Sequence, residues 1–174
     1  MVDWEDIQKT HGQTVWSVAY RILAHEEDAR DCFQEVFLEA FGKSNADAVG
    51  NWGGFLRWLA TRRAIDLLRT RRRQRTVALA DQEFPAPALV SRTVEWLETI
   101  EAVRQELTQL PESQATAFWL FSVEGLSYQD IADHTRSNVN SVGLLIYRAR
   151  QRLKLRLSTL ASDWNDQKSS IAHE

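Results

Sequence analysis

The sequence contains a single cysteine, Cys32, among its 174 residues. One cysteine excludes a disulfide within the chain. The four histidines are scattered, so no group of cysteines and histidines has the spacing of a zinc site. We expect Cys32 to be a small core residue. The chain therefore fits a reducing compartment.

Long hydrophobic runs are also missing. The first ten residues, MVDWEDIQKT, carry acidic side chains where a signal peptide needs a basic and then an apolar run. No apolar stretch approaches the roughly 20 residues that span a bilayer. We expect a cytoplasmic protein with no membrane insertion.

Motifs of catalysis are absent as well. The sequence has no P-loop, no glycine fingerprint and no nucleophile motif. Four acids fall on one side of a predicted helix, at Asp28, Asp31, Glu35 and Glu39, but the Glu-x-x-His pair of helical di-metal sites is missing. We expect no catalytic residue, no metal and no cofactor.

Positive charge, by contrast, is concentrated in one place. The formal net charge is -3, yet the stretch RWLATRRAIDLLRTRRRQR at 57–75 carries eight arginines and one aspartate. Such a patch suits a polyphosphate, meaning nucleic acid or an anionic surface. A solvated helix end is the plainer alternative.

Hydrophobic spacing predicts an all-α protein. At 26–41 apolar residues recur three and four apart, which predicts a helix that Gly42 ends and one buried stripe of Ala29, Phe33, Val36, Phe37, Ala40 and Phe41. The polar, glycine-rich segment at 42–54 predicts a loop. Helical spacing resumes at Phe55, and the arginines at 57, 62, 69 and 71–73 are expected to project outward.

A proline-bearing segment divides the chain. The stretch TVALADQEFPAPALVS, at 76–91, holds two of the three prolines and loses the helical period, which indicates a flexible linker. We expect two small helical domains, at 1–75 and 96–160, joined by a linker at 76–95. A short tail at 161–174 follows, either partly disordered or folded back on the second domain.

The second domain has the proportions of a helix-turn-helix. A short helix at about 127–134 is followed by a polar turn at 135–138 and a longer helix from about 139. Ser127 can cap the first of these helices, with Asp130 completing an approximate capping box. Helix pairs of this kind also occur as plain packing units, so the pattern alone leaves DNA binding open.

These blocks together resemble the extracytoplasmic-function group of bacterial sigma factors, the smallest members of the sigma-70 family. The segment EEDARDCFQEVFLEAF is similar to the family's domain 2 helix, with Gln-Glu-Val-Phe at 34–37. The segment FLRWLATRRAIDLLRTRRR at 55–73 is similar to the basic helix that follows it. The segment at 110–153 is similar to domain 4, from its Leu-Pro start to its Arg-Ala-Arg at 148–150.

The resemblance implies an RNA polymerase sigma factor that directs transcription initiation by binding core RNA polymerase and promoter DNA. It also implies two helical domains, a sigma domain 2 bundle and a sigma domain 4 helix-turn-helix. A free-standing two-domain helix-turn-helix regulator that binds duplex DNA as a dimer is the alternative. That alternative explains the second domain but not the 34–37 block or the glycine-rich segment before a basic helix.

Site residues follow from the same resemblance. The clamp helices of the largest polymerase subunit would be bound by Asp31, Gln34, Glu35 and Phe37, although burial in the core also explains Phe37. The minus-ten element would be melted and held by Trp52, Arg57, Trp58, Arg62, Arg63, Asp66, Arg69 and Arg72. Both tryptophans have core burial as the alternative reading. Arginines at phosphates supply affinity and little sequence information.

Domain 4 would sit on the polymerase flap and the upstream DNA, with candidate contacts at Ser127, Tyr128, Asn138, Asn140, Ser141 and Arg148. This domain departs from the family pattern. Arg136 stands in the turn where the family usually has Gly, and Gly143 and Leu145 replace a Lys and an Arg. Leu144 is expected to point outward. Either the remaining polar residues read the minus-thirty-five element, or this surface faces a protein partner. An anti-sigma factor that clamps both domains is a possible partner.

Overall fold

The computed structural model describes residues 3–42, 49–77 and 94–171. The segment 43–48, most of the predicted linker, and residues 172–174 lie outside this range. Every regular element within the described residues is an α-helix, which confirms the predicted all-α class. No described helix combines the length and the apolar character needed to cross a membrane.

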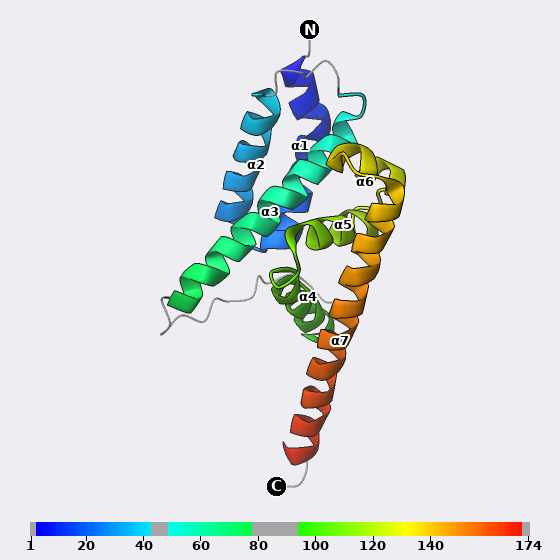
Figure 1. Cartoon of the computed structure of the whole chain (residues 1–174). Coiled ribbons are helices and arrows are strands. Elements are labelled where there is room, and N and C mark those ends of the chain that lie inside the picture. Colours follow the sequence, from blue (N-terminus) through cyan, green and yellow to red (C-terminus); the bar gives the residue numbers. More distant parts are fainter. Residues whose placement is uncertain (1–2, 43–48, 78–93, 172–174) are drawn as a thin grey trace.

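The first two helices, α1 (Trp4–Leu23) and α2 (Glu26–Phe41), form an antiparallel pair (Figure 1). The Asp3 side chain accepts hydrogen bonds from the amides of Glu5 and Asp6, both at 3.1 Å, and so caps α1. The first turn of α2 holds only acidic residues, which its helix dipole favours.

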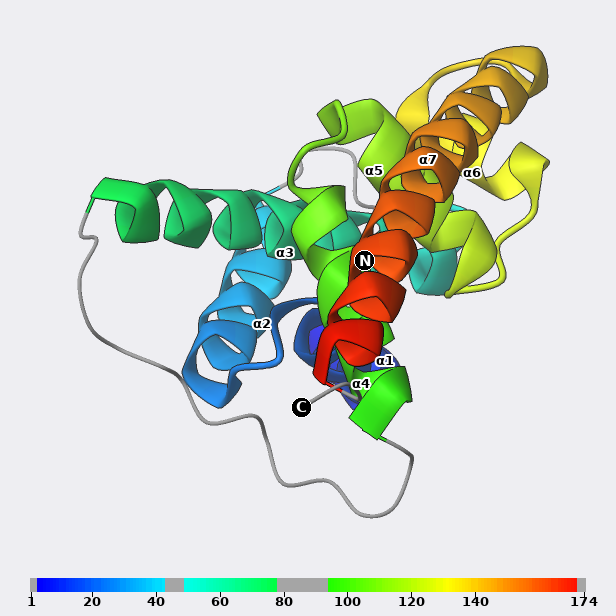
Figure 2. The same cartoon turned by 90° about the horizontal axis from the view of Figure 1, so that it is seen from below.

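Helix α3 (Trp52–Val77) lies at the centre of the molecule. It packs against α1 and α2 on one side and against α5 (Glu112–Ser122) and α6 (Tyr128–Thr135) on the other (Figures 1 and 2). It begins three residues earlier than the sequence predicted, inside the glycine-rich segment. The Asn51 side chain accepts a hydrogen bond from the Gly54 amide at 2.9 Å and helps to start the helix there.

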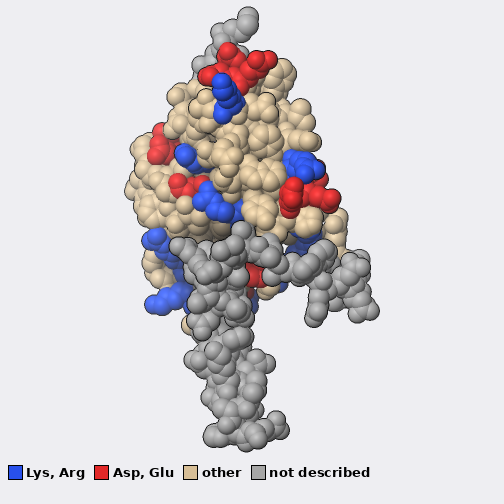
Figure 3. All heavy atoms as spheres, turned by 180° about the vertical axis from the view of Figure 1, so that it is seen from behind, with Lys and Arg blue, Asp and Glu red and all other residues tan. Residues whose placement is uncertain are grey.

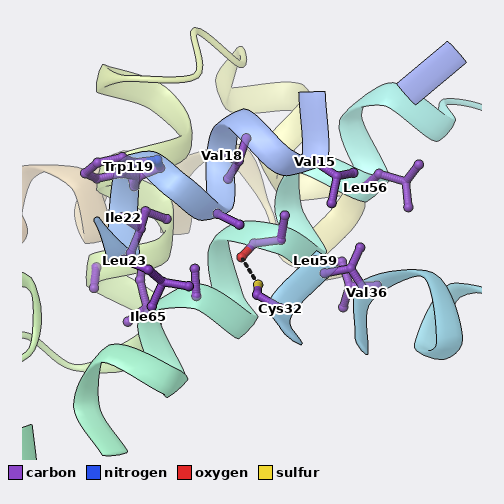
Figure 4. Close-up of a cluster of buried hydrophobic side chains, with 14 of the residues drawn as sticks. Val15, Val18, Ile22, Leu23, Cys32, Val36, Leu56, Leu59, Ile65 and Trp119 are labelled. Atoms are coloured by element: carbon purple, nitrogen blue, oxygen red, sulfur yellow. Dashed lines mark hydrogen bonds between the residues drawn. The ribbon is translucent and has the colours of Figure 1, made fainter. Parts of the chain in front are cut away.

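The large hydrophobic core draws on both halves of the chain. Leu107, Leu110, Ala115 and Trp119 are buried in the same cluster as the inner residues of α1, α2 and α3, part of which Figure 4 shows. A smaller cluster holds the helix-turn-helix together, with Leu120, Ile131, Val142 and Ile146 at its centre. The second half of the chain therefore covers the first half rather than standing apart from it.

Cys32 is fully buried in the large core, as expected for a small core residue. Its thiol donates to the carbonyl oxygen of Ala60 at 3.8 Å (Figure 4). Burial, with a smaller contribution from Glu35, raises the pKa of this thiol to about 12. The group is therefore a neutral packing element rather than a reactive thiolate.

The second half contains α4 (Val94–Leu107), α5, α6 and α7 (Val139–Ile171). The capping box predicted at the start of α6 is confirmed, because Ser127 Oγ accepts from the Asp130 amide and the Asp130 carboxylate accepts from the Ser127 amide, both at 3.1 Å. Helix α7 continues through most of the predicted tail. No proline or glycine follows Gly143 to end it.

Candidate nucleic-acid interface

The arginines of the first half of α3 lie against acidic side chains. Arg63 pairs with Glu39 of α2 at 2.6 Å, between Nη2 and Oε2. Arg62 lies 3.7 Å from the same carboxylate and 3.3 Å from Glu112 at the start of α5. Arg57 is half-buried on the same helix. The sequence analysis predicted that Arg62 projects outward. In the structure its side chain instead contacts two neighbouring helices, α2 and α5.

The second half of α3 binds the segment between α4 and α5. Arg69 donates to the carbonyl oxygen of Leu110 at 2.6 Å, and its side chain is only 15% exposed. Arg72 donates to the carbonyl oxygen of Gln105 at 2.8 Å and to Thr108 Oγ1 at 2.6 Å. These two arginines join the halves of the molecule through hydrogen bonds to the backbone.

Further along α3, Arg71 forms an ion pair with Asp28 of α2. Several of the basic side chains of α3 therefore form ion pairs or hydrogen bonds with other residues of this chain. On the opposite face of the molecule, shown in Figure 3, Lys and Arg side chains also lie in small groups, several of them directly beside Asp or Glu. The positive charge that is concentrated in the sequence is in large part compensated in the folded structure.

Asp66 lies among these arginines, 3.8 Å from Arg69. Burial and the nearby Glu112 raise the pKa of its carboxyl group, although Arg62, Arg69 and Arg63 oppose the shift. Glu112 of α5 thus places a second negative charge near the Asp66 carboxylate of α3. This pairing of acids is a cost of the contact between α3 and α5.

The two tryptophans proposed for DNA contact are partly buried. Trp52 packs edge-on against Trp4, with ring centroids 5.2 Å apart, and against Phe55 at 5.8 Å. Trp58 packs on both hydrophobic clusters, and the Arg62 guanidinium lies 5.8 Å from its ring centroid. In this arrangement both rings serve packing, which agrees with the alternative reading of core burial.

The α2 residues predicted to bind polymerase share one helix. Asp31, Gln34 and Glu35 are exposed, whereas Phe37 is partly buried and lies 4.9 Å from the ring of Phe33. The Gln34 side chain borders an open hollow of about 540 Å³ between α1 and α2. Polar and apolar groups are therefore both available on this side of the molecule.

Two apolar residues at the end of α2 are exposed, which the sequence analysis did not predict. Leu38 is 71% exposed and Phe41 is 65% exposed. The prediction that Phe41 joins the buried stripe is wrong, because the end of α2 leaves its ring at the surface in edge contact with Trp4 at 5.3 Å. Helical spacing indicates which face of a helix a residue occupies, but not how completely neighbouring helices cover the last turn.

The candidate DNA-contact residues of the helix-turn-helix differ in position: some cap helices, one is a half-buried ring and others lie at the surface. Ser127 caps α6, and the Asn138 side-chain oxygen accepts from the Ser141 amide at 2.8 Å, so it caps α7. Tyr128 is half-buried with its ring 4.8 Å from Phe121. Asn140 and Arg148 are exposed, and Ser141 is partly so.

The three departures from the family pattern lie in different local environments. Arg136 ends α6 in the left-handed region, with a φ of 53°. Leu145 is half-buried against the smaller core cluster, and a Cβ at Gly143 would lie 3.5 Å from the Tyr128 ring. Leu144 points outward as predicted and is 47% exposed.

Two further contacts hold α6 and the α5–α6 turn against the first half. The imidazole of His134 lies directly over Gly54, where an added Cβ would clash with its Nε2, and 6.4 Å from the Phe55 ring. Burial lowers the pKa of His134, with Asp130 and Asp133 opposing the shift. Arg21 of α1 reaches Glu124 at 3.2 Å, and the Glu124 side chain is only 3% exposed.

Family models match both halves of the chain. Residues 7–74 match the model described as Sigma-70 region 2, and residues 100–153 match Sigma-70, region 4. The first match covers α1, α2 and most of α3, and the second covers the helix-turn-helix. The order of the two matches agrees with the order of the blocks in the sequence.

Individual proteins show the same likeness. The RNA polymerase sigma-H factor of Pseudomonas aeruginosa is 32% identical, over 80% of this chain and 78% of its own. The ECF RNA polymerase sigma factor SigE of Mycolicibacterium smegmatis is 28% identical over 94% of this chain, which spans 65% of the length of that relative. The sigma factor RpoE of Bartonella quintana, solved in complex with the anti-sigma factor NepR, has the same fold, with a TM-score of 0.59 at 19% identity over 90% of this chain and 97% of its own.

Proposed function

Because the chain belongs to the extracytoplasmic-function group of RNA polymerase sigma factors, in the sigma-70 family, we propose that it brings core RNA polymerase to promoter DNA through three separate surfaces. It acts by binding rather than by catalysis, and it acts in the cytoplasm, where transcription takes place. The observation that carries the assignment of the polymerase surface is the exposure of Asp31, Gln34 and Glu35 on one helix, α2, although Arg63 of α3 lies 3.9 Å from the Glu35 carboxylate.

The polymerase surface is α2. Asp31, Gln34 and Glu35 are exposed there and supply polar contacts to the clamp helices of the largest polymerase subunit. Phe37 borders them, and the exposed side chains of Leu38 and Phe41 extend the apolar area. An apolar centre with a polar rim is the usual composition of a protein interface.

The minus-ten surface is α3. Its arginines at 57, 62, 63, 69 and 72 would release counterions from the DNA backbone, and Trp52 and Trp58 would stack on unpaired bases. Asp66 sits among them as a negative group that orients the guanidinium groups. Because Arg69 and Arg72 donate to backbone oxygens of Leu110 and of Gln105 in the last turn of α4, DNA binding here requires α4 and the segment after it to move away.

The upstream surface is the helix-turn-helix. Asn140, Ser141 and Arg148 on α7 would contact the minus-thirty-five element, with Ser127, Tyr128 and Asn138 near the DNA at the ends of the helices. The same domain would rest on the polymerase flap. Since the solved Bartonella quintana relative is held by an anti-sigma factor, an anti-sigma partner is part of this proposal.

Binding to purified bacterial core RNA polymerase tests the polymerase surface. The double variant Asp31→Ala with Gln34→Ala is expected to bind core polymerase at least about tenfold more weakly, the loss typical of removing central polar contacts. A matched control replaces the same residue types at exposed positions of α1, which belongs to none of the three surfaces, as Asp6→Ala with Gln8→Ala. Equal weakening by both double variants would contradict the assignment to α2. Failure of the unaltered chain to bind core polymerase would contradict the function itself.

A further inference from the structure

The first two turns of α7 carry no charged side chain. From Val139 to Tyr147 the sequence has no Lys, Arg, Asp or Glu, and the first basic residue of the helix is Arg148. The N-terminal residues of such a helix are the ones that reach base edges in the major groove. Guanine is usually read there by Arg or Lys hydrogen-bonding to its O6 and N7 atoms. The base-reading part of this helix lacks those groups.

An amide and two apolar side chains form the outward face instead. Asn140, Leu144 and Tyr147 are spaced four and three residues apart, which places them on one side of the helix. Leu144 is 47% exposed and Tyr147 is 60% exposed, and Asn140 is exposed as well. The opposite side of α7 is buried in the smaller core cluster through Val142 and Ile146.

Cations lie on both sides of this face. Arg136 is exposed in the turn before α7, and exposed basic side chains recur after the face, at Arg148, Arg150, Arg152, Lys154 and Arg156. No acidic residue occurs from 139 to 162. The partner of this surface is therefore a polyanion. A base-reading strip flanked by phosphate-binding cations is the arrangement expected for duplex DNA.

We propose that Leu144, with Tyr147 beside it, reads thymine through its 5-methyl group, and that Asn140 reads a neighbouring adenine. Thymine is distinguished in the major groove by an apolar methyl group, and adenine offers N6 and N7 to an amide side chain. The upstream element of this sigma factor is therefore specified by A·T pairs under the first two turns of α7, without a guanine contact from those turns. This inference rests on the proposed function and adds the chemistry of its upstream site.

The test uses the holoenzyme of the full chain with bacterial core RNA polymerase. Duplexes with a randomised upstream element are selected for binding, and each thymine of the selected element is then replaced by deoxyuridine. That replacement removes one methyl group and leaves the hydrogen-bonding pattern unchanged. We expect at least one position where affinity falls about fourfold, the factor that one buried methylene-sized group supplies.

The variant Leu144→Ala identifies the side chain that makes the contact. It should bind the thymine and deoxyuridine elements equally, while its affinity for core polymerase stays unchanged. The control Leu155→Ala removes an equally large exposed side chain from the same helix, three turns further along, and should preserve the difference between the two elements. Leu144 is at the surface, so the folded state is expected to tolerate its truncation.

Three results would overturn the inference. One is a selected element in which every thymine can be replaced by deoxyuridine without loss. Another is a thymine preference that Leu144→Ala leaves intact. The third is no preference for any upstream sequence, which would assign the apolar face to a protein partner. A chain that forms no holoenzyme would instead refute the proposed function.

Discussion

At the scale of single residues, Arg136 is in a conformation that does not suit an arginine. Its φ of 53° and ψ of 39° lie in the left-handed region, where a residue with a Cβ is disfavoured by roughly 1–2 kcal/mol. Glycine is the usual residue at this position after a helix, because it has no such penalty. The sequence thus departs from the family pattern at a turn position where the backbone favours glycine.

Arg136→Gly should therefore stabilise the protein. We expect the free energy of unfolding to rise by about 1 kcal/mol, as measured by urea denaturation. Arg136→Ala is the control, since it removes the same charge and keeps the strained backbone. A gain of equal size in both variants would show that the charge, rather than the backbone conformation, is responsible.

Residue-level exposure was predicted unevenly by the sequence. Helical spacing correctly predicted the outward position of Leu144, because this depends on the local helical face, and the burial of Cys32 follows from the usual behaviour of a free cysteine. It failed for Phe41, the last residue of α2, which is 65% exposed although its ring contacts Trp4 of α1. It also could not find the acceptors of Arg69 and Arg72, because these are backbone and hydroxyl oxygens outside any motif.

At the scale of secondary structure, α6 depends on its N-terminal capping box. The helix has only eight residues, so a single capping interaction satisfies a large share of its unpaired amide groups. The hydrogen bonds from Ser127 lower the pKa of Asp130 below its usual 3.8. The pKa of Asp130 is lower in the folded protein than in the unfolded chain. The capping interaction therefore stabilises the protein fully above the unfolded-chain pKa of 3.8, and this stabilisation is lost as the pH falls through the lowered folded-state pKa.

Ser127→Ala should destabilise the protein by about 1 kcal/mol at neutral pH. The measurement is urea denaturation at pH 7, repeated at a pH below the lowered pKa of Asp130, where the effect of the substitution should shrink. Ser122→Ala, at the exposed end of α5, is the control and should have little effect. A loss that does not change with pH would contradict a role for the charged form of Asp130.

Elements were predictable to different degrees. Capping residues and apolar spacing specified α2, α6 and the start of α7, since these signals are local. Helix α7 extends to Ile171 although the sequence analysis ended the domain at residue 160, because nothing in the later stretch breaks a helix and only its polar composition suggested a tail. Composition is a weaker guide to helix length than the presence of glycine or proline.

At the scale of the whole molecule, the second half of the chain covers the surface proposed for the minus-ten element. Arg69 and Arg72 are held by the α4–α5 segment, Arg62 contacts Glu112, and Glu124 is buried beside Arg21. Under the proposed assignment, promoter binding and this arrangement exclude each other along α3. The proposal therefore requires the chain to open before α3 can hold single-stranded DNA.

Arg21→Glu should favour the open form. The substitution leaves the buried Glu124 carboxylate facing a like charge, which destabilises the contact between the two halves. We expect a larger radius of gyration in small-angle X-ray scattering and tighter binding of single-stranded minus-ten DNA without polymerase, by about tenfold or more.

Lys9→Glu makes the same change of charge at an exposed position of α1 and serves as the control. Arg21 lies outside all three proposed binding surfaces, so a change in DNA affinity reports the opening itself. Unchanged scattering together with unchanged DNA binding would contradict the view that this contact holds the two halves together.

His134 lies so close to Gly54 that the contact between the two halves depends on glycine at this position. A methyl group at position 54 would displace the imidazole ring and loosen the closed form, and it would also lie 3.0 Å from the Asn51 side-chain nitrogen, beside the hydrogen bond that helps to start α3. The contact between the two halves and the first turn of α3 thus depend on the same missing side chain. A single methyl group at position 54 would loosen both at once.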